Sequence, residues 1–307
     1  MATCRGCTIK KSEGFNGRKG APTTRDWAQA IQTLKPEHDL DMLLQIKGMA
    51  RATYYYSIKT RKDKYALLRK AIARIFEQNK GRYGYRRVYE QLRIEGYMIN
   101  HKTVAKLMAE MDLYARRRKV RYRSYKGDVG RIAPNLLQRD FVTDGPNQKW
   151  ATDITQIDIR GKKCYLSPIL DMWNGEIISY TISDSPNLKM VTDMLQKAFR
   201  KQTPSKGMLM HSDQGWHYQH IKYRTILQQN GIIQSMSRKG NCLDNAMMEN
   251  FFGLMKNELL YPNKWEDIDE FKQALKEYIK YYNHKRIKLK LKMSPIKYRT
   301  HFQNIVN

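Results

Sequence analysis

The sequence predicts an α/β protein in which an all-helical domain precedes a mixed sheet with flanking helices. Between residues 36 and 113, apolar side chains recur at helical spacing and glycines interrupt the pattern. From residue 148 onward, short apolar runs with hairpin signals give way to alternating helical and strand-like segments. With 307 residues, 41% of them hydrophobic, the chain is long enough for two domains and at least one core.

The chain is strongly basic. Lys and Arg number 57 against 29 Asp and Glu, which gives a formal net charge of +28. Such an excess needs a polyanionic partner, either nucleic acid or a membrane surface. The charge is spread over Tyr-rich, folded-looking segments and not gathered on one amphipathic helix, which favours nucleic acid. We see no secretory signal and no apolar stretch of membrane-spanning length, so we expect a cytoplasmic protein.

The N-terminal part of the chain is predicted to contain a flexible lead-in and then a helical domain. Residues 1–35 are rich in polar residues without periodicity, and residues 36–115 are helical in pattern. The first helices of that domain are marked by Leu40, Leu43 and Leu44, by a turn at Gly48, and by residues 50–58. This pair is either a helix-turn-helix or a plain helical hairpin.

A clearer helical pattern covers residues 64–113. The segment GRYGYRR (81–87) is predicted as a loop between two helices, and Asn100 is the expected N-cap of the last helix. We interpret these helices as a compact helix-turn-helix-like unit that binds DNA, with a purely structural subdomain as the alternative. Its candidate DNA contacts are Arg86, Arg87 and Lys102.

A basic run follows directly. Seven of the eleven residues from 116 to 126 are Lys or Arg, with two tyrosines between them. Charge runs are usually solvated tails, but this one joins two folded regions. We therefore predict a basic linker at residues 116–145 that follows the DNA backbone, with candidate contacts at Arg116, Arg117, Arg118, Lys119, Arg121 and Arg123.

The second half of the chain has the element order of a ribonuclease-H-like fold. Turn signals at 160–161 and at the Asn-Gly pair 174–175 predict an antiparallel three-stranded meander. The predicted elements are strands at 149–157, 163–172 and 176–182, a helix at 188–198, a strand at 207–211, a helix at 218–229, a strand at 232–236, and a long helix from Asp244. We expect a mixed five-stranded sheet in a catalytic core at residues 146–262, followed by a helical extension at 263–307.

Three acidic residues occupy notable places in this pattern. Asp153 is predicted in the middle of the first strand, Asp213 at the end of the fourth strand and Glu249 on the long helix. An acid within an apolar strand is costly unless a partner compensates its desolvation, and Mg²⁺ prefers carboxylate oxygens. Two such ions, with Mn²⁺ as a possible substitute, can drive phosphoryl displacement. Taken singly, each acid could instead bond within its strand, begin a turn or face solvent.

Together, the three acids and their surroundings resemble a known family. The flanking motifs are WATD (150–153), HSDQG (211–215), SRKGNCLDNA (237–246), YYN (281–283), SPIKY (294–298) and GRYGYRRV (81–88). They are similar to motifs of the transposases of two-frame bacterial insertion sequences with an integrase-like core. In that family 35 residues lie between the second and third acids of the DDE motif, as they do between Asp213 and Glu249 here. The resemblance covers roughly residues 40–300.

The resemblance implies metal-dependent DNA cleavage and strand transfer at the ends of an insertion sequence. It implies a double-stranded DNA substrate, a homo-oligomer on DNA, and a segment supplied by an upstream reading frame. Lys256 and Asn245 are carried over as residues that contact or adjoin DNA, and both share the helix face of Glu249 by spacing. A catalytically inert DNA-binding regulator and an ordinary nuclease of the same fold are the alternatives.

Three further polar residues are given structural roles. Asp171 ends the second predicted strand and could join the acidic cluster, but capping of the turn at 174–175 explains it more simply. His211 and His217 flank the second acid, and we interpret each as a positioning residue and not as a metal ligand.

Overall fold

The computed structural model describes residues 22–59, 63–115, 132–238 and 242–306. The chain divides into two compact units, residues 1–66 and 67–307, and each is described by itself. None of the helices within these ranges is long and apolar enough to cross a membrane.

The smaller unit contains three helices, α1 (Thr24–Leu34), α2 (Leu40–Lys47) and α3 (Arg51–Ile58). The predicted pair is confirmed as α2 and α3, with Gly48 in the left-handed conformation between them. The prediction of a flexible lead-in through residue 35 is wrong for α1. A capping box between Thr23 and Asp26 fixes its start, and Ala28 and Ile31 are buried against the other two helices. Residues 1–21 lie outside the described residues.

The larger unit begins with the helices α4 (Ala66–Gln78), α5 (Tyr85–Ile94) and α6 (His101–Glu110). Asn100 caps α6 as predicted, because its side chain accepts the Lys102 N–H at 2.8 Å. The predicted loop at 81–87 is shorter than expected, since α5 already begins at Tyr85 with Gly84 as its N-cap.

The sheet contains six strands, β1 (Lys149–Thr152), β2 (Thr155–Ile159), β3 (Lys162–Asp171), β4 (Ile177–Ser183), β5 (Leu209–Ser212) and β6 (Ile233–Met236). Both β1 and β2 pair antiparallel with β3, at successive stretches of its length, and β4 also pairs antiparallel with β3. Strand β5 runs parallel to β1, and β6 runs parallel to β5. The predicted single strand at 149–157 is therefore divided, which turns the expected five strands into six.

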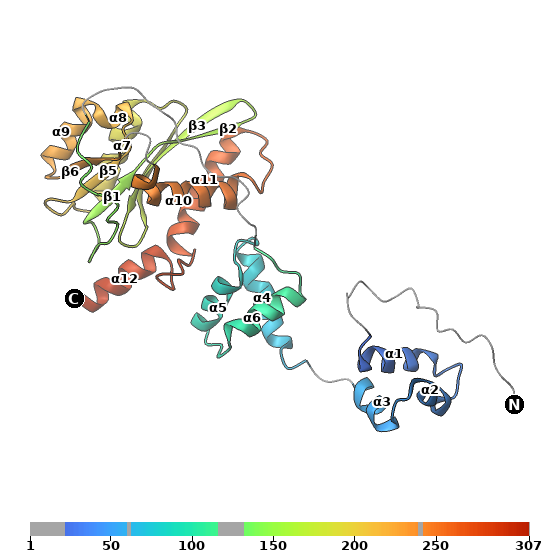
Figure 1. Ribbon diagram of the computed structural model, residues 1–307. Helices are drawn as coiled ribbons and strands as arrows, with labels where there is room; N and C mark the ends of the chain where they lie inside the picture. The colour runs from blue at the N-terminus through green and yellow to red at the C-terminus, as the bar shows by residue number, and fades with distance from the viewer. Residues whose placement is uncertain (1–21, 60–62, 116–131, 239–241, 307) are drawn as a thin grey trace. The chain divides into compact units, whose positions relative to one another are not determined.

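Helices cover both faces of the sheet (Figure 1). On one face α7 (Leu188–Lys201) and α9 (Ile221–Gln229) pack over Trp150, with the short helix α8 (Trp216–Gln219) between β5 and α9. On the other face α10 (Ala246–Met255) and α11 (Ile268–His284) pack over Ala151. The alternation of Trp150 and Ala151 between two cores is the period-2 pattern of a strand buried on both sides.

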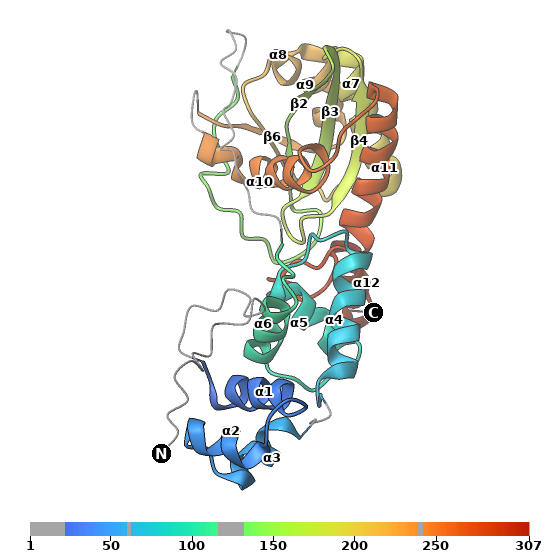
Figure 2. The ribbon, with the colours of Figure 1, turned by 90° about the vertical axis from the view of Figure 1, so that its right-hand side faces the viewer.

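The predicted long helix from Asp244 is not one regular helix. A 3₁₀ turn, η1 (Cys242–Asn245), precedes α10, and a π-helical turn, η2 (Lys256–Leu260), follows it. Helix α12 (Pro295–Val306) follows α11, and Figure 2 shows α11 running alongside the strands. Sheet order and flanking helices make this a ribonuclease-H-like core preceded by a helical domain, as predicted.

Candidate active site

Asp153 lies in the interruption between β1 and β2, not in the middle of a strand. Its Oδ1 atom accepts a hydrogen bond from the Ile154 N–H at 2.7 Å. A backbone donor bonded to the preceding side chain is unavailable to the sheet, so the ladder stops there. The Asp153 side chain is nevertheless buried, with 9% of the residue exposed.

Asp213 lies at the same edge of the sheet. It follows the last residue of β5, and its Oδ1 atom accepts the Gly215 N–H at 2.9 Å. In the parallel pair of β1 and β5, Ala151 stands opposite His211. Asp153 and Asp213 each follow two residues later, so the register brings both acids to the carboxyl ends of adjacent strands.

Glu249 approaches this edge from α10. It lies in the first turn of that helix, and α10 packs against the sheet face formed by Ala151 and Leu166. Asn245, just before the helix, donates from Nδ2 to the carbonyl oxygen of Thr152 at 3.2 Å. This bond fixes the start of α10 next to Asp153, which makes Asn245 a positioning residue. Its buried Oδ1 atom has no hydrogen-bond partner within the described residues.

The acids and Lys256 form one electrostatic cluster. Burial raises the pKa of Asp153 well above its usual value, and the charges of Asp213 and Glu249 raise it further. The Ile154 N–H and the Lys256 ammonium oppose this rise. Burial also raises the pKa of Asp213, and burial lowers the pKa of Lys256 against the attraction of Asp153. The sequence-predicted triad and Lys256 are therefore close enough to influence one another's charge.

These carboxylates match the oxygen ligands that Mg²⁺ and Mn²⁺ take. Carboxylates raised in pKa by burial and mutual repulsion are ionised more readily when a divalent cation is bound. Across the described ranges, no three His, Cys, Asp or Glu side chains are arranged closely enough to hold a metal ion. Joint coordination by all three acids would therefore need their carboxylates to come closer together.

Asp171 shows how a buried aspartate in this core is neutralised without a metal. Its Oδ2 atom accepts from Arg299 at 2.7 Å and from the Asn147 N–H at 3.0 Å. Its Oδ1 atom accepts the Trp173 N–H, and its carbonyl accepts the Gly175 N–H, so it caps the predicted turn. No sequence pattern indicated Arg299 as the partner, because it lies 128 residues away in the chain.

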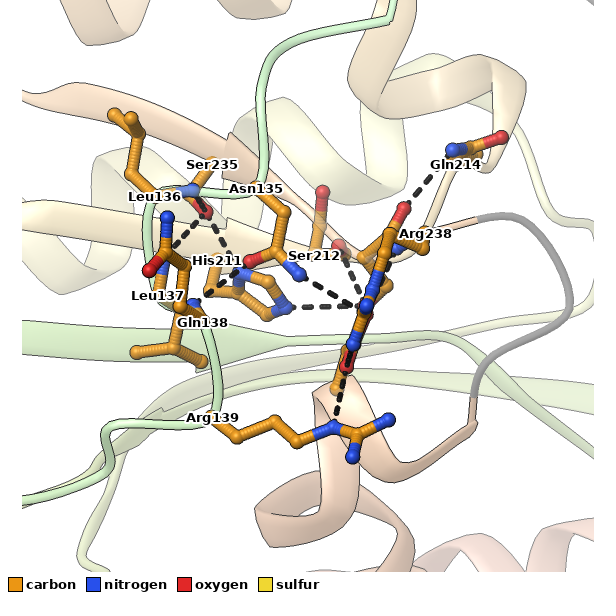
Figure 3. A network of polar contacts seen from close by, with 12 residues as sticks. Asn135, Leu136, Leu137, Gln138, Arg139, His211, Ser212, Gln214, Ser235 and Arg238 are labelled. Carbon is orange, nitrogen blue, oxygen red and sulfur yellow. Dashed lines mark hydrogen bonds and ion pairs between the residues drawn. The ribbon is translucent and has the colours of Figure 1, made fainter.

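His211 is held between two serine hydroxyls, and Figure 3 shows its ring beside Ser235. Its Nδ1 and Nε2 atoms lie 2.9 Å and 3.0 Å from the hydroxyls of Ser235 and Ser237. Burial lowers its pKa to about 4, so the ring is neutral at ordinary pH. His217 donates from Nε2 to the Pro186 carbonyl at 2.6 Å, and both histidines have the structural roles expected of them.

The sequence did not predict the ionic network around the buried Asp244. Asp244 accepts hydrogen bonds from Arg238 at 3.0 Å, Arg139 at 2.9 Å and Asn135 at 3.0 Å, and the arginines hold its pKa below its usual range. Figure 3 shows Arg139 and Arg238 converging from separate segments. The network ties the segment before β1 to the start of α10, where the sequence showed only a helix start.

The candidate DNA contacts have different environments. Arg86 and Lys102 are exposed, whereas Arg87 is half-buried and donates from Nε to the Ile287 carbonyl at 3.0 Å. That bond gives Arg87 a role inside the fold. The contacts predicted at Arg116, Arg117, Arg118, Lys119, Arg121 and Arg123 lie outside the described residues.

Known families match most of this architecture. The model of an integrase core domain matches residues 143–242, and a second integrase core model matches residues 249–302. The model of an HTH-like domain matches residues 62–121.

Individual proteins are similar over most of the chain. A protein of Escherichia coli K12, described as the putative transposase InsK of insertion element IS150, is 49% identical over 274 residues, covering 88% of this chain and 97% of that protein. The probable transposase of IS1353 from Shigella flexneri is 39% identical, and the match covers 95% of this chain and 57% of that protein. Among solved structures, the HTLV-2 integrase catalytic core domain in complex with magnesium is 15% identical with a TM-score of 0.41, covering 51% of this chain and 98% of that chain.

Proposed function

The chain belongs to the bacterial insertion-sequence transposases with an integrase-type core, and from this membership we propose that Asp153, Asp213 and Glu249 are its catalytic acids. A transposase of this class is a polynucleotidyl transferase that acts on DNA. The proposal adds the metal dependence, the residues and the order of the chemical steps.

The pairing of Asp153 with Asp213 carries the proposal. Two carboxylates, the buried Asp153 and the half-buried Asp213, follow adjacent parallel strands at one sheet edge, and the pKa of each is raised. Neither side chain has an ion-pair partner within the described ranges, in contrast to Asp171 with its Arg299. One or two Mg²⁺ ions, or Mn²⁺ in their place, would activate an attacking hydroxyl and stabilise the leaving oxygen.

The reaction proposed for this site has two displacements at phosphorus. Water attacks a phosphodiester at the element end, the bond to the 3′-oxygen breaks, and a 3′-hydroxyl is released. That hydroxyl then attacks a phosphodiester of a second DNA segment, which joins the strands and releases a new 3′-hydroxyl. Such transfers depend mainly on positioning and electrostatic stabilisation.

The remaining residues position the helix and the DNA. Asn245 holds the start of α10 against Thr152, which sets the distance between Glu249 and the sheet edge. Lys256 is half-buried near Asp153, where its ammonium group could bind a phosphate of the terminal DNA. Arg86, Lys102 and the basic run from Arg116 to Lys126 supply further phosphate contacts.

Assembly and location follow from the same proposal. Joining two DNA ends requires that they be held together, so the protein acts as a homo-oligomer on DNA, in the bacterial cytoplasm. Recognition of element ends also uses a segment encoded by an upstream reading frame. This chain spans 57% of the IS1353 transposase, so at least one relative contains substantial further sequence.

The test separates binding from chemistry. Asp153→Asn, Asp213→Asn and Glu249→Gln are each expected to lose cleavage and joining while they keep folding and DNA binding in a gel-shift assay. Wild-type protein that binds DNA but never cleaves it with Mg²⁺ or Mn²⁺ would favour the inert regulator. Hydrolysis without joining would favour the nuclease.

A further inference from the structure

A cavity lies between the start of α5 and the catalytic helix α10. Its volume is about 320 Å³, and both walls belong to the larger unit of the chain. One wall contains Gly84 and Arg86, and the opposite wall contains Asn250, Leu254 and Asn257. Asn250 and Asn257 directly follow Glu249 and Lys256, so the cavity opens beside the helix face that carries the active-site residues.

Long-range hydrogen bonds hold the two walls together. The Tyr83 hydroxyl donates to the Lys285 carbonyl at 3.2 Å and accepts the Ile287 N–H at 2.8 Å. Arg82 donates from Nε to the Glu258 carbonyl at 3.2 Å, and its guanidinium lies 4.7 Å from the centre of the Tyr281 ring. The cavity is therefore a fixed feature of this unit, since its walls are bonded to each other at several points.

The cavity carries positive charge that the fold does not compensate. Arg82, Arg86 and Arg87 line it, and each uses only its Nε atom in a hydrogen bond. In the part of the chain that the structure describes, their terminal NH groups have no hydrogen-bond partner. Among the described residues that line the cavity, the one acid is Glu258, which is already paired with buried Arg286 at 2.6 Å. Burial and the charge of Arg286 lower the pKa of Arg87, a cost that a bound anion would relieve.

Apolar side chains complete the lining. Leu254, Leu289 and Ala115 contribute carbon surface, and Tyr85 adds an aromatic ring. A ligand with an anionic end and a flat apolar end satisfies both halves of this lining. A nucleotide has this form, because guanidinium groups bind its phosphate and apolar or aromatic groups contact its base and sugar.

We propose that this cavity binds one nucleotide unit of a DNA strand and thereby holds that strand alongside α10. The proposal rests on the proposed function for its choice of DNA as the polyanion. Contacts of this kind tolerate any base, so the cavity would anchor the strand without reading its sequence.

The experiment measures binding of a short 5′-phosphorylated oligonucleotide of arbitrary sequence to the full chain in EDTA, by fluorescence anisotropy. Arg86→Ala removes an exposed guanidinium, and Ala115→Trp fills the cavity without changing charge. Arg200→Ala is the matched control, because it removes one exposed arginine from α7. We expect each cavity variant to weaken binding roughly tenfold and the control to weaken it less than about twofold.

Two outcomes would overturn the proposal. The first is an effect of Arg86→Ala no larger than that of Arg200→Ala, or wild-type binding by Ala115→Trp with an unchanged melting temperature. The second is competition by deoxyadenosine monophosphate or inorganic phosphate at the concentration at which the oligonucleotide competes, which would assign the cavity to a free small anion. Because these measurements need no metal and no chemistry, retained joining by Asp153→Asn would refute the proposed catalytic acids and leave this result unaffected.

Discussion

Asp153 and Asp171 are two buried aspartates of the same sheet. The fold compensates the charges of these two carboxylates in opposite ways. Asp171 is neutralised by Arg299, which also bonds Glu176, and by two backbone N–H groups. Asp153 has one backbone donor and two acidic neighbours. The first arrangement stabilises the fold by itself, whereas in the second the proposed Mg²⁺ or Mn²⁺ would supply the compensating charge.

This contrast predicts that Asp153→Asn stabilises the protein when no metal is present. A carboxyl whose pKa is raised in the folded state favours folding below its unfolded pKa, and that contribution is lost as the pH rises through the folded pKa. At neutral pH, which is above the unfolded pKa, the raised pKa of Asp153 therefore costs stability, and removing the carboxyl charge should stabilise the fold by on the order of 1 kcal/mol. Thermal melting in EDTA measures this, and the gain should shrink as the pH is lowered toward 4.

Asp171→Asn is the control, and it should have the reverse effect. It leaves the buried Arg299 with one acidic partner in place of two, which should destabilise the fold by roughly 3 kcal/mol. Mg²⁺ or Mn²⁺ should raise the melting temperature of wild-type protein and of Asp171→Asn, but not of Asp153→Asn. A melting temperature of Asp153→Asn in EDTA below that of wild type would contradict this account.

The sequence predicts at residue scale only what local spacing determines. Asp213 and Glu249 could be selected because strand ends, helix faces and the gap between them are visible in the sequence. Arg299 as the partner of Asp171, and Ile287 as the partner of Arg87, lie more than 100 residues away in the chain. No periodicity connects such pairs, so three-dimensional packing alone reveals them.

At the scale of elements, the predictions from sequence were wrong where a side chain took the place of a backbone hydrogen-bond partner. The first strand is divided because the Asp153 side chain takes the Ile154 N–H, which an apolar alternation does not predict. Helix α1 was missed although Thr23 and Asp26 form a capping box and Ala28 and Ile31 follow at helical spacing. The sequence pattern of α1 was therefore present. The polar residues that precede α1 made the segment look irregular, so the start of the helix was not recognised.

The loop before α5 gives an element-scale prediction about stability. Tyr83→Phe removes a hydroxyl that serves two backbone groups of the segment after α11 and leaves the buried Ile287 N–H without a partner. We expect a loss of roughly 1–3 kcal/mol in the free energy of unfolding. Urea denaturation checks it, with Tyr261→Phe, whose ring is 55% exposed, as the control that should change little. Equal midpoints for Tyr83→Phe and wild type would show that the loop does not anchor the helices to the core.

The basic run gives a second element-scale prediction. Alanine at Arg116, Arg117, Arg118 and Lys119 should weaken binding to every DNA sequence to a similar degree. Each phosphate contact that is lost should reduce the slope of log affinity against log salt by about 0.9. Titrations at several salt concentrations measure the slope, and an unchanged slope would exclude the run from the DNA interface.

At the scale of the whole molecule, the larger unit of the chain combines the integrase-type core with the helices α4, α5 and α6. The Tyr83 and Arg82 bonds connect the loop before α5 to the segment after α11 and to η2. In the proposed function, DNA held by the helices α4, α5 and α6 would thereby lie beside α10. The element order and the family could be predicted from sequence, whereas this coupling depends on contacts between residues roughly 200 apart.

The most direct test of the central claim is a strand-transfer assay with a labelled element-end duplex and a circular target. Wild-type protein, supplied as a fusion to its upstream segment if the chain alone binds ends poorly, should join the labelled strand to the target with Mg²⁺ and not with EDTA. Asp171→Asn should retain joining under conditions where it is folded, and Asp153→Asn should give no joined product. Joining by Asp153→Asn at a rate near that of wild type, or joining in EDTA, would contradict a metal-dependent site built on Asp153, Asp213 and Glu249.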